Sequence, residues 1–263
     1  MNELLAGQAQ QALIALLFSL PRILAAFILL PMFSRQLFPG ITRSSVAISL
    51  ALTLLPMLLV EAPVSAPGWA EGLALTVKEI LIGLLIGFGA AIPFWVIDST
   101  GFFIDNQRGS TMASSIDPMT GAQTAPMGIL LTQTLVVIFF VGGGLLIFLQ
   151  ALYESYRVWP VFSFFPRLES DALPYLLSLL DRVMALTVLL AAPVILAMFM
   201  TEFAMGLISR FTPQMNVFAL AMPIKSAVGI FILVIYISFL FRFIGQELWR
   251  VAAHFTILGQ FFQ

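Results

Sequence analysis

Six long apolar runs, separated by turn-rich stretches, constrain this fold more than any other feature of the sequence. A helix needs roughly 20 apolar residues to cross a bilayer core about 30 Å thick, because its backbone must satisfy its own hydrogen bonds where water is absent. The runs therefore predict an all-α, membrane-associated protein built of helical hairpins. They cover residues 12–33, 44–60, 72–98, 128–152, 175–209 and 226–241.

The composition excludes several classes of function. Hydrophobic residues make up 60% of the 263 residues and charged residues only 10%, whereas ordinary soluble domains have about 25% charged residues. The net charge of -1 offers no basic surface for nucleic acid. With no cysteine and a single histidine, His254, the chain lacks the donors of common metal sites and catalytic triads. We expect no nucleic-acid partner, no metal, no cofactor and no enzyme activity.

Charged residues in or near the apolar runs are expected to face protein, because a lipid-facing charge is strongly unfavourable. Lys78 and Glu79 are adjacent and cannot share a helix face, which favours pairing with neighbouring subunits or other segments over pairing with each other. A proton relay is the alternative for these two residues. Glu202 could couple ions in a transporter, but an interhelical hydrogen bond is the favoured interpretation. The residues in question are Arg22, Lys78, Glu79, Asp181, Arg182 and Glu202.

Prolines and glycines within the runs predict kinked and closely packed helices. Proline removes a backbone donor that neighbouring groups must compensate, whereas glycine lets two helices approach. Gly83, Gly87 and Gly89 include small-xxx-small spacing, and the run Gly142–Gly144 is also expected to allow close packing. The prolines are Pro21, Pro31, Pro56, Pro93 and Pro193.

The C-terminal residues, about 242–263, predict an amphipathic helix with polar residues at every fourth position: Arg242, Gln246, Arg250 and His254. A lone histidine on such a helix is expected to be solvated or packed rather than a metal ligand. The Lys and Arg residues divide five against four between the two sides of a six-span arrangement, so the orientation stays open. The first apolar run follows no cationic region, and we expect no cleaved signal peptide.

The connection at about residues 99–128 is the most informative part of the chain. It is rich in Gly, Ser, Thr, Ala and Met and poor in charge, which suits a constriction better than a solvated linker. Asp105 and Arg108 are spaced to pair on one helical turn, and Gly109 would end that turn. A turn-stabilising ion pair and a hinge both fit this spacing. Three methionines, Met112, Met119 and Met127, could form a soft seal or simply fill gaps.

Several motifs in order resemble the SctT family of the bacterial type III secretion export apparatus, which is homologous to flagellar FliR. The loop reads IDNQRGSTMASSIDPMTGAQTAPMGILLTQ at 104–133. The other segments are LPRILAAFILLPMFS at 20–34, KEILIGLLIGFGAA at 78–91 and FFVGGG at 139–144. DNQRG at 105–109, and the DP followed by Gly121 and Gln123, resemble the injectisome branch.

The resemblance implies one copy of a structural subunit that closes a helical hetero-oligomeric ring with SctR and SctS, beside SctU and SctV. Unfolded effector proteins would pass through this ring, in the bacterial inner membrane, with part of the assembly projecting to the periplasmic side. Residues 1–263 would form a single export-apparatus subunit, with a pore plug at 109–128. The expected plug-loop residues are Asp105, Asn106, Gln107, Arg108, Gly109, Met112, Asp117, Pro118, Met119, Gly121, Gln123 and Met127.

A self-contained ion-coupled secondary transporter is the alternative, with Lys78, Glu79 and Glu202 as coupling groups. The sequence has no convincing internal repeat with matched broken helices, and the central loop has no obvious part in alternating access. An intramembrane hydrolase has less support, because the chain has one histidine and no recognised catalytic motif.

Overall fold

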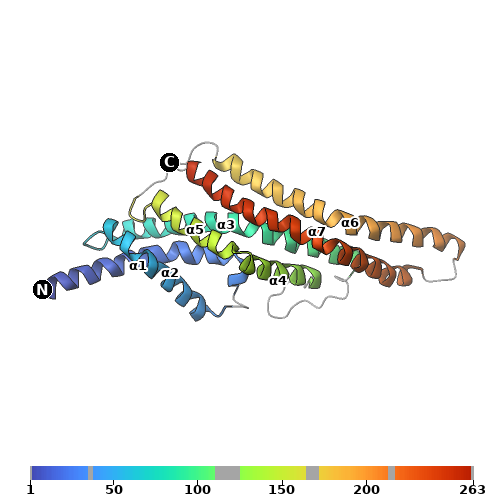
Figure 1. Ribbon diagram of the computed structural model, residues 1–263, viewed down its shortest axis with the longest axis horizontal. Helices are drawn as coiled ribbons and strands as arrows, with labels where there is room; N and C mark the ends of the chain where they lie inside the picture. Colours follow the sequence, from blue (N-terminus) through green and yellow to red (C-terminus); the bar gives the residue numbers. More distant parts are fainter. Residues whose placement is uncertain (1, 35–37, 110–124, 164–171, 213–216, 262–263) are drawn as a thin grey trace. The chain divides into compact units, whose positions relative to one another are not determined.

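Every regular element in the part of the chain that the structure describes is a helix, which confirms the all-α prediction (Figure 1). The computed structural model describes residues 2–34, 38–109, 125–163, 172–212 and 217–261. The elements are α1 (Asn2–Leu29), η1 (Pro31–Phe33), α2 (Gly40–Glu61), α3 (Trp69–Arg108), α4 (Pro126–Val141), α5 (Gly144–Val158), α6 (Ala172–Phe211) and α7 (Val217–Phe261).

Five helices in these ranges are long and apolar enough to cross a membrane, and α4 with α5 counts as a sixth if the two form one broken span. The run at 128–152, expected as one helical segment, is divided into α4 and α5, which bend by 73° at the break. Gly142 ends α4, and Gly143 adopts a left-handed backbone with φ of 77°. A side chain would be strained in that conformation, so these glycines break the helix. The expected close helix packing is not found at Gly143, where a Cβ would meet no atom within 4 Å.

The expected separate tail helix at about 242–263 is instead the continuation of α7, which runs unbroken to Phe261. Its buried stripe of Leu233, Leu240, Ile244 and Leu248 crosses the expected boundary at helical spacing, so there is no reason for the helix to stop there. Arg242 and Gln246 are exposed, as the polar stripe predicted. The side chains of Arg250 and His254 lie outside those described.

The described chain forms two compact units, and α3, α6 and α7 each contribute to both. Unit 1 comprises Met1–Ile92, Gly143–Leu176 and Trp249–Gln263, and unit 2 comprises Pro93–Gly142 and Leu177–Leu248. In unit 1, α1 packs against α2 and crosses α3 at two glycines. A Cβ on Gly83 would overlap the Arg22 carbonyl oxygen, and one on Gly87 would lie 2.6 Å from that of Ala26. The small-xxx-small prediction is confirmed for this pair of glycines.

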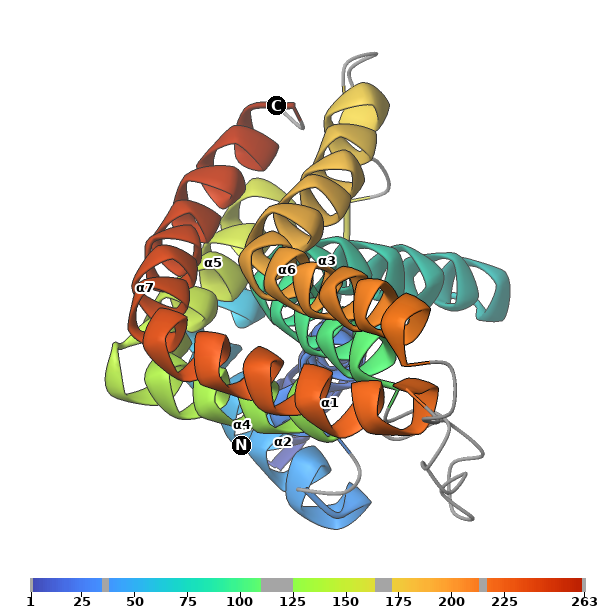
Figure 2. The same cartoon turned by 90° about the vertical axis from the view of Figure 1, so that its right-hand side faces the viewer.

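Unit 2 contains two antiparallel helix pairs. The second half of α3 packs against α4, where Gly101 meets the backbone of Gly128 and the rings of Phe94 and Phe139 lie 5.4 Å apart. The α6 and α7 helices lie side by side (Figures 1 and 2), with Gly229 of α7 packed on a methionine of α6. A short connection joins α6 to α7, as expected of a helical hairpin, whereas α3 and α4 are joined by the longer central connection.

We predict that Gly83→Ala destabilises the protein by about 1–3 kcal/mol, because the added methyl overpacks the contact between α1 and α3. Gly206→Ala is the matched control, since a Cβ there meets nothing within 4 Å. In a helix this change removes backbone freedom from the unfolded chain and should leave stability unchanged or slightly higher. Thermal unfolding in detergent, followed by tryptophan fluorescence, measures both. Equal midpoints for Gly83→Ala and the wild type would contradict the close contact.

Candidate functional site

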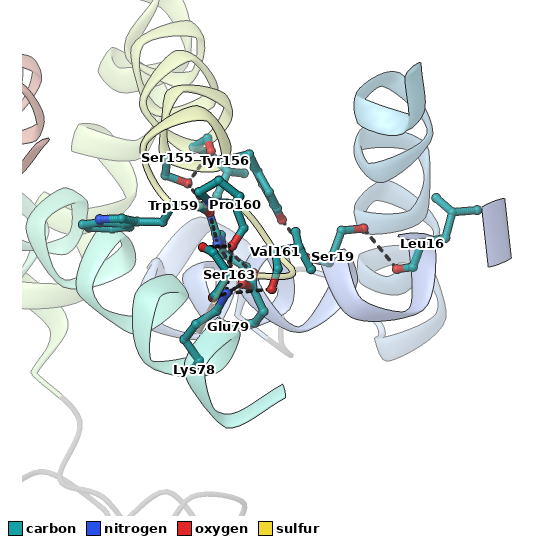
Figure 3. Close-up of polar contacts among 12 residues, drawn as sticks. Leu16, Ser19, Lys78, Glu79, Ser155, Tyr156, Trp159, Pro160, Val161 and Ser163 are labelled. Carbon is teal, nitrogen blue, oxygen red and sulfur yellow. Dashed lines mark hydrogen bonds and ion pairs between the residues drawn. The ribbon is translucent and has the colours of Figure 1, made fainter. Parts of the chain in front are cut away.

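A buried charge cluster brings together three residues that the sequence singled out, Arg22, Lys78 and Glu79. Figure 3 shows Lys78 and Glu79 beside Ser155, Tyr156 and Trp159. The Arg22 and Glu79 side chains, on α1 and α3, are fully buried. Arg22 donates from Nε to Oε2 of Glu79 at 2.7 Å and from Nη2 to Oε1 at 2.8 Å. A bidentate arginine–carboxylate pair is among the strongest side-chain contacts, and burial removes competition from water. The pair therefore ties α1 to α3 beside the glycine contact.

The rest of the guanidinium is bound by α5 and the residues that follow it. Its Nη1 donates to the Ser155 hydroxyl at 3.1 Å, and its Nη2 donates to the Trp159 carbonyl at 2.8 Å. The carbon of the guanidinium lies 4.1 Å from the centre of the Tyr156 ring. The Tyr156 hydroxyl in turn donates to the Ser19 carbonyl at 2.8 Å. One arginine thus holds three helices together.

Lys78 continues the cluster toward the surface of unit 1. Its Nζ lies 3.0 Å from Oε1 of Glu79, and it donates to three carbonyls at 2.7–2.9 Å, those of Pro160, Val161 and Ser163. The expectation that Lys78 and Glu79 would not pair with each other is therefore wrong. The long lysine stem can bend back along its own helix, and the three carbonyls hold the ammonium there. Pairing with other segments of the chain is confirmed.

Ser155, Tyr156 and Trp159 were missed by sequence reasoning, although they complete the cluster. They follow the apolar part of a predicted segment, in a stretch that reads ESYRVWP at 154–160. Such a polar and aromatic end next to a predicted span is a signal that could have identified them. Their contact with Arg22 could not be predicted from any local pattern, because Arg22 is more than 130 residues away in the chain.

The start and end of the central connection meet at Asp105. Its Oδ1 lies 3.3 Å from Nη1 of Arg108, and Gly109 leaves the helix with φ of 79°. The predicted pair and the glycine that ends the turn are both confirmed. Asp105 also accepts the backbone N–H of Met127 through Oδ2 at 2.7 Å. That N–H lies in the first turn of α4, where no intrahelical acceptor exists, so α3 supplies a cap to α4.

The expected loop at 99–128 is too long at both ends. Residues 99–108 belong to α3, and residues 126–128 belong to α4. The small residues that suggested a loop serve helix packing instead: Thr100 bonds to the Val96 carbonyl in its own helix, and Gly101 touches Gly128. Asn106 and Gln107 occupy the last turn of α3. The remaining expected plug residues, Met112, Asp117, Pro118, Met119, Gly121 and Gln123, lie outside the described residues.

Two interhelical ion pairs join α6 and α7. Glu202 accepts from Nζ of Lys225 at 3.0 Å, which confirms its expected interhelical hydrogen bond. Arg182 donates to Glu247 at 2.7 Å. Within this chain Asp181 and Glu202 are exposed, so for these two residues the expected contact with protein stays a prediction about partner subunits. Each lies at an edge of the apolar stretch, where a side chain can leave it.

The described residues contain no group of three or more His, Cys, Asp and Glu side chains that could hold a metal ion. The polar groups of the charge cluster bind one another and backbone carbonyls. Chemically, the cluster and the Asp105 contacts can fix helices and turns in position.

Comparisons with known proteins extend over most of the chain. Residues 13–251 match the family described as bacterial export proteins, family 1. The chain is 45% identical over 234 residues to the Yop proteins translocation protein T of Yersinia pestis, covering 89% of each chain. It is 34% identical over 218 residues to the surface presentation of antigens protein SpaR of Salmonella typhimurium, covering 82% of this chain and 80% of SpaR. The flagellar biosynthetic protein FliR of Bacillus subtilis is 30% identical over 222 residues, or 84% of this chain and 85% of FliR.

We predict that Glu79→Gln destabilises the protein by about 3–5 kcal/mol, because it leaves the buried Arg22 charge without its counter-ion. The control is Glu154→Gln, which removes an exposed pair with Arg157 at 3.8 Å and should change stability by less than about 1 kcal/mol. Thermal unfolding in detergent compares the two variants. A double variant, Arg22→Met with Glu79→Leu, should recover part of the loss. Equal stability of the two single variants would contradict a central role for the cluster.

We predict that Asp105→Ala exposes the amide of Met127, because the first turn of α4 then has no acceptor for that N–H. Hydrogen–deuterium exchange of the peptide covering 125–132 should become faster. Asp98→Ala is the control, since Asp98 makes only a 3.4 Å contact with the Thr132 hydroxyl on the same helix pair. Unchanged exchange in Asp105→Ala would show that the carboxylate does not cap α4.

Proposed function

The chain belongs to the bacterial export proteins, family 1, and from this membership we propose that it is a structural subunit of a type III secretion export apparatus. The relatives named as translocation or antigen-presentation proteins are 45% and 34% identical. The flagellar relatives are 30% and 25% identical. This difference, together with the DNQRG motif at 105–109, supports the injectisome branch over the flagellar one. The subunit is a multi-pass protein of the bacterial inner membrane, in an assembly that projects to the periplasmic side.

One observation carries the proposal of an assembly. Large apolar side chains are exposed along α6 from Leu177 to Phe211, a distance of about 50 Å at roughly 1.5 Å per residue. A bilayer core covers only about 30 Å. The remaining apolar surface would contact water in an isolated chain, and such patches on proteins mark sites of association. A subunit that is covered by partner chains accounts for this surface, whereas a self-contained transporter does not.

The partners that the family resemblance implies are SctR and SctS, which would form a helical ring closed by one copy of this chain, with SctU and SctV beside it. The ring would conduct unfolded effector proteins. The role of this chain in the ring would be structural, because holding helices around a pore needs no catalytic group. We assign no enzyme activity to the chain. The charge cluster of Arg22, Lys78 and Glu79 is then a clamp that keeps unit 1 in one arrangement.

The central connection is the part that we propose closes the pore. Its two ends are set by Asp105, which binds Arg108 in α3 and the Met127 amide in α4. Both ends of the segment are therefore held at one point of unit 2. This is the support that the described residues give to a plug between α3 and α4, and the methionines of the segment would serve as its soft, polarizable contacts.

The transporter alternative needs carboxylates that are free to gain and lose an ion. Glu79 is held by Arg22 and Lys78, and Glu202 is paired with Lys225. Both contacts favour a fixed, structural charge. No observation favours the transporter over the subunit.

Co-expression with SctR and SctS of the same secretion system tests the assembly. A tag on this chain, extraction in mild detergent and native mass spectrometry should retrieve a defined hetero-oligomer that contains one copy of it. A stable, folded monomer or homodimer that retrieves neither partner would overturn the proposal and bring the transporter forward.

We predict that shortening the connection between α3 and α4, within residues 110–124, lets small solutes leak through the assembled complex while assembly is preserved. The plug would no longer fill the path, whereas Asp105 and its contacts remain. Solute efflux from vesicles that contain the purified assembly is the measurement, and retrieval of the partners by the variant is the control. An assembled variant that conducts no more than the wild type would refute the plug.

A further inference from the structure

We propose that the hydrocarbon core of the bilayer contacts this chain between the two interhelical ion pairs of α6 and α7, and that these pairs mark its edges. The stretch between the pairs is called the lipid belt below and comprises residues 183–201 of α6 and 226–246 of α7. The inference deepens the proposed function, because it separates the surface that meets lipid from the surface left for partner subunits. The contact with lipid itself does not require those partners.

The α6 and α7 helices form an antiparallel hairpin (Figures 1 and 2). One ion pair joins the two helices at each end of the belt. Arg182 in the first half of α6 pairs with Glu247 in the second half of α7 at 2.7 Å. Glu202 pairs with Lys225 at 3.0 Å at the other end. Each pair is partly exposed, so its charges can reach water or lipid headgroups. Paired charges that can reach water are suited to the interface between lipid headgroups and acyl chains, where a charge is less unfavourable than in the hydrocarbon core.

The distance between the pairs matches a bilayer core on both helices. Arg182 and Glu202 are about 30 Å apart along α6, and Lys225 and Glu247 about 33 Å apart along α7, at roughly 1.5 Å per residue. The hydrocarbon core of a bilayer is about 30 Å thick. A protein partner would impose no such length on two helices at once, which favours lipid as the occupant.

The belt surface has the chemistry of an acyl-chain contact. All exposed residues of α6 between the pairs are apolar, and Leu189, Leu196 and Phe199 are at least half exposed. On α7 the exposed residues are apolar apart from Ser238, Arg242 and Gln246, and Gln246 is next to Glu247 at the edge of the belt. Arg242 lies about 7 Å from the level of Glu247, within reach of the interface for a long side chain that extends toward water.

Beyond the pairs the same helices remain apolar. Leu177 is exposed before Arg182, and Leu207 and Phe211 are exposed after Glu202. These residues lie outside the belt, at the level of headgroups or water, where lipid chains cannot cover them. They are the part of the hairpin that the proposed function assigns to partner subunits.

The chain has no cysteine, so single cysteines can carry a fluorescent label without further changes. Leu189→Cys, Leu196→Cys and Val234→Cys report on the belt, and Leu177→Cys and Leu207→Cys report on the flanks. Val194→Cys is the matched control, because Val194 lies in the belt region of α6 but is buried. Each labelled protein is reconstituted, alone and with SctR and SctS, in phosphatidylcholine vesicles that carry bromine in the middle of the acyl chains.

Labels in the belt should lose most of their fluorescence in brominated vesicles, with or without the partner subunits. Labels on the flanks and at Val194 should keep theirs. Belt labels that remain bright in both preparations overturn the inference, as do flank labels that are quenched as strongly as belt labels.

A second readout separates this inference from the proposed function. Before labelling, a water-soluble maleimide should modify Leu177→Cys and Leu207→Cys in the chain alone and should modify them much more slowly in the assembly. If no assembly forms, or if the flank cysteines react equally fast in the chain alone and in the assembly, the assignment of the flanks to partner subunits fails. The quenching experiment still tests whether lipid contacts the belt. If the assembly protects the flank cysteines from the maleimide and the belt labels are not quenched, the proposed function stands and the inference of a lipid contact is wrong.

Discussion

The bidentate contact between Arg22 and Glu79 is the interaction on which unit 1 depends. Two charges that are fully buried must be paired, because either one alone would carry the full penalty of its lost hydration. Here the pair also directs the packing around it: the remaining donors of Arg22 fix the end of α5, and Lys78 fixes the residues after it. The glycines of α3 allow α1 to come close enough for the contact to form. Charge and close packing therefore specify one arrangement of helices together.

Unit 2 uses polar contacts differently, at the ends of helices rather than in the middle of a packed core. Asp105 joins the end of α3 to the start of α4, and the two ion pairs join α6 and α7 on either side of a long apolar stretch. Between these points, contact is made by apolar and small residues. In an apolar surrounding, the helices gain little from mutual burial alone, so a few polar contacts at defined levels set how far one helix slides along its neighbour.

Much of the fold could be predicted from the sequence, because helices that cross an apolar phase must be long and apolar, and five of the six predicted runs correspond to unbroken helices. The close approach at Gly83 and the turn at Gly109 also followed from local spacing. The break at Gly143 could not be separated from close packing, since glycine serves both purposes. The charge cluster was found only as separate residues, because the contacts of Arg22 join α1 to groups that are distant in the chain. Local pattern likewise placed residues 99–108 in a loop, although Gly101 packs against Gly128.

The cap that α3 provides for α4 also bears on how this protein can evolve. Because Asp105 and the Met127 amide meet directly, the alignment of these two helices is set by residues on either side of the intervening segment and not by the segment itself. Residues can then be gained, lost or exchanged between the two contact points while the hairpin keeps its register. Selection on the sequence of the segment is thereby uncoupled from selection on the folding of the two helices that flank it.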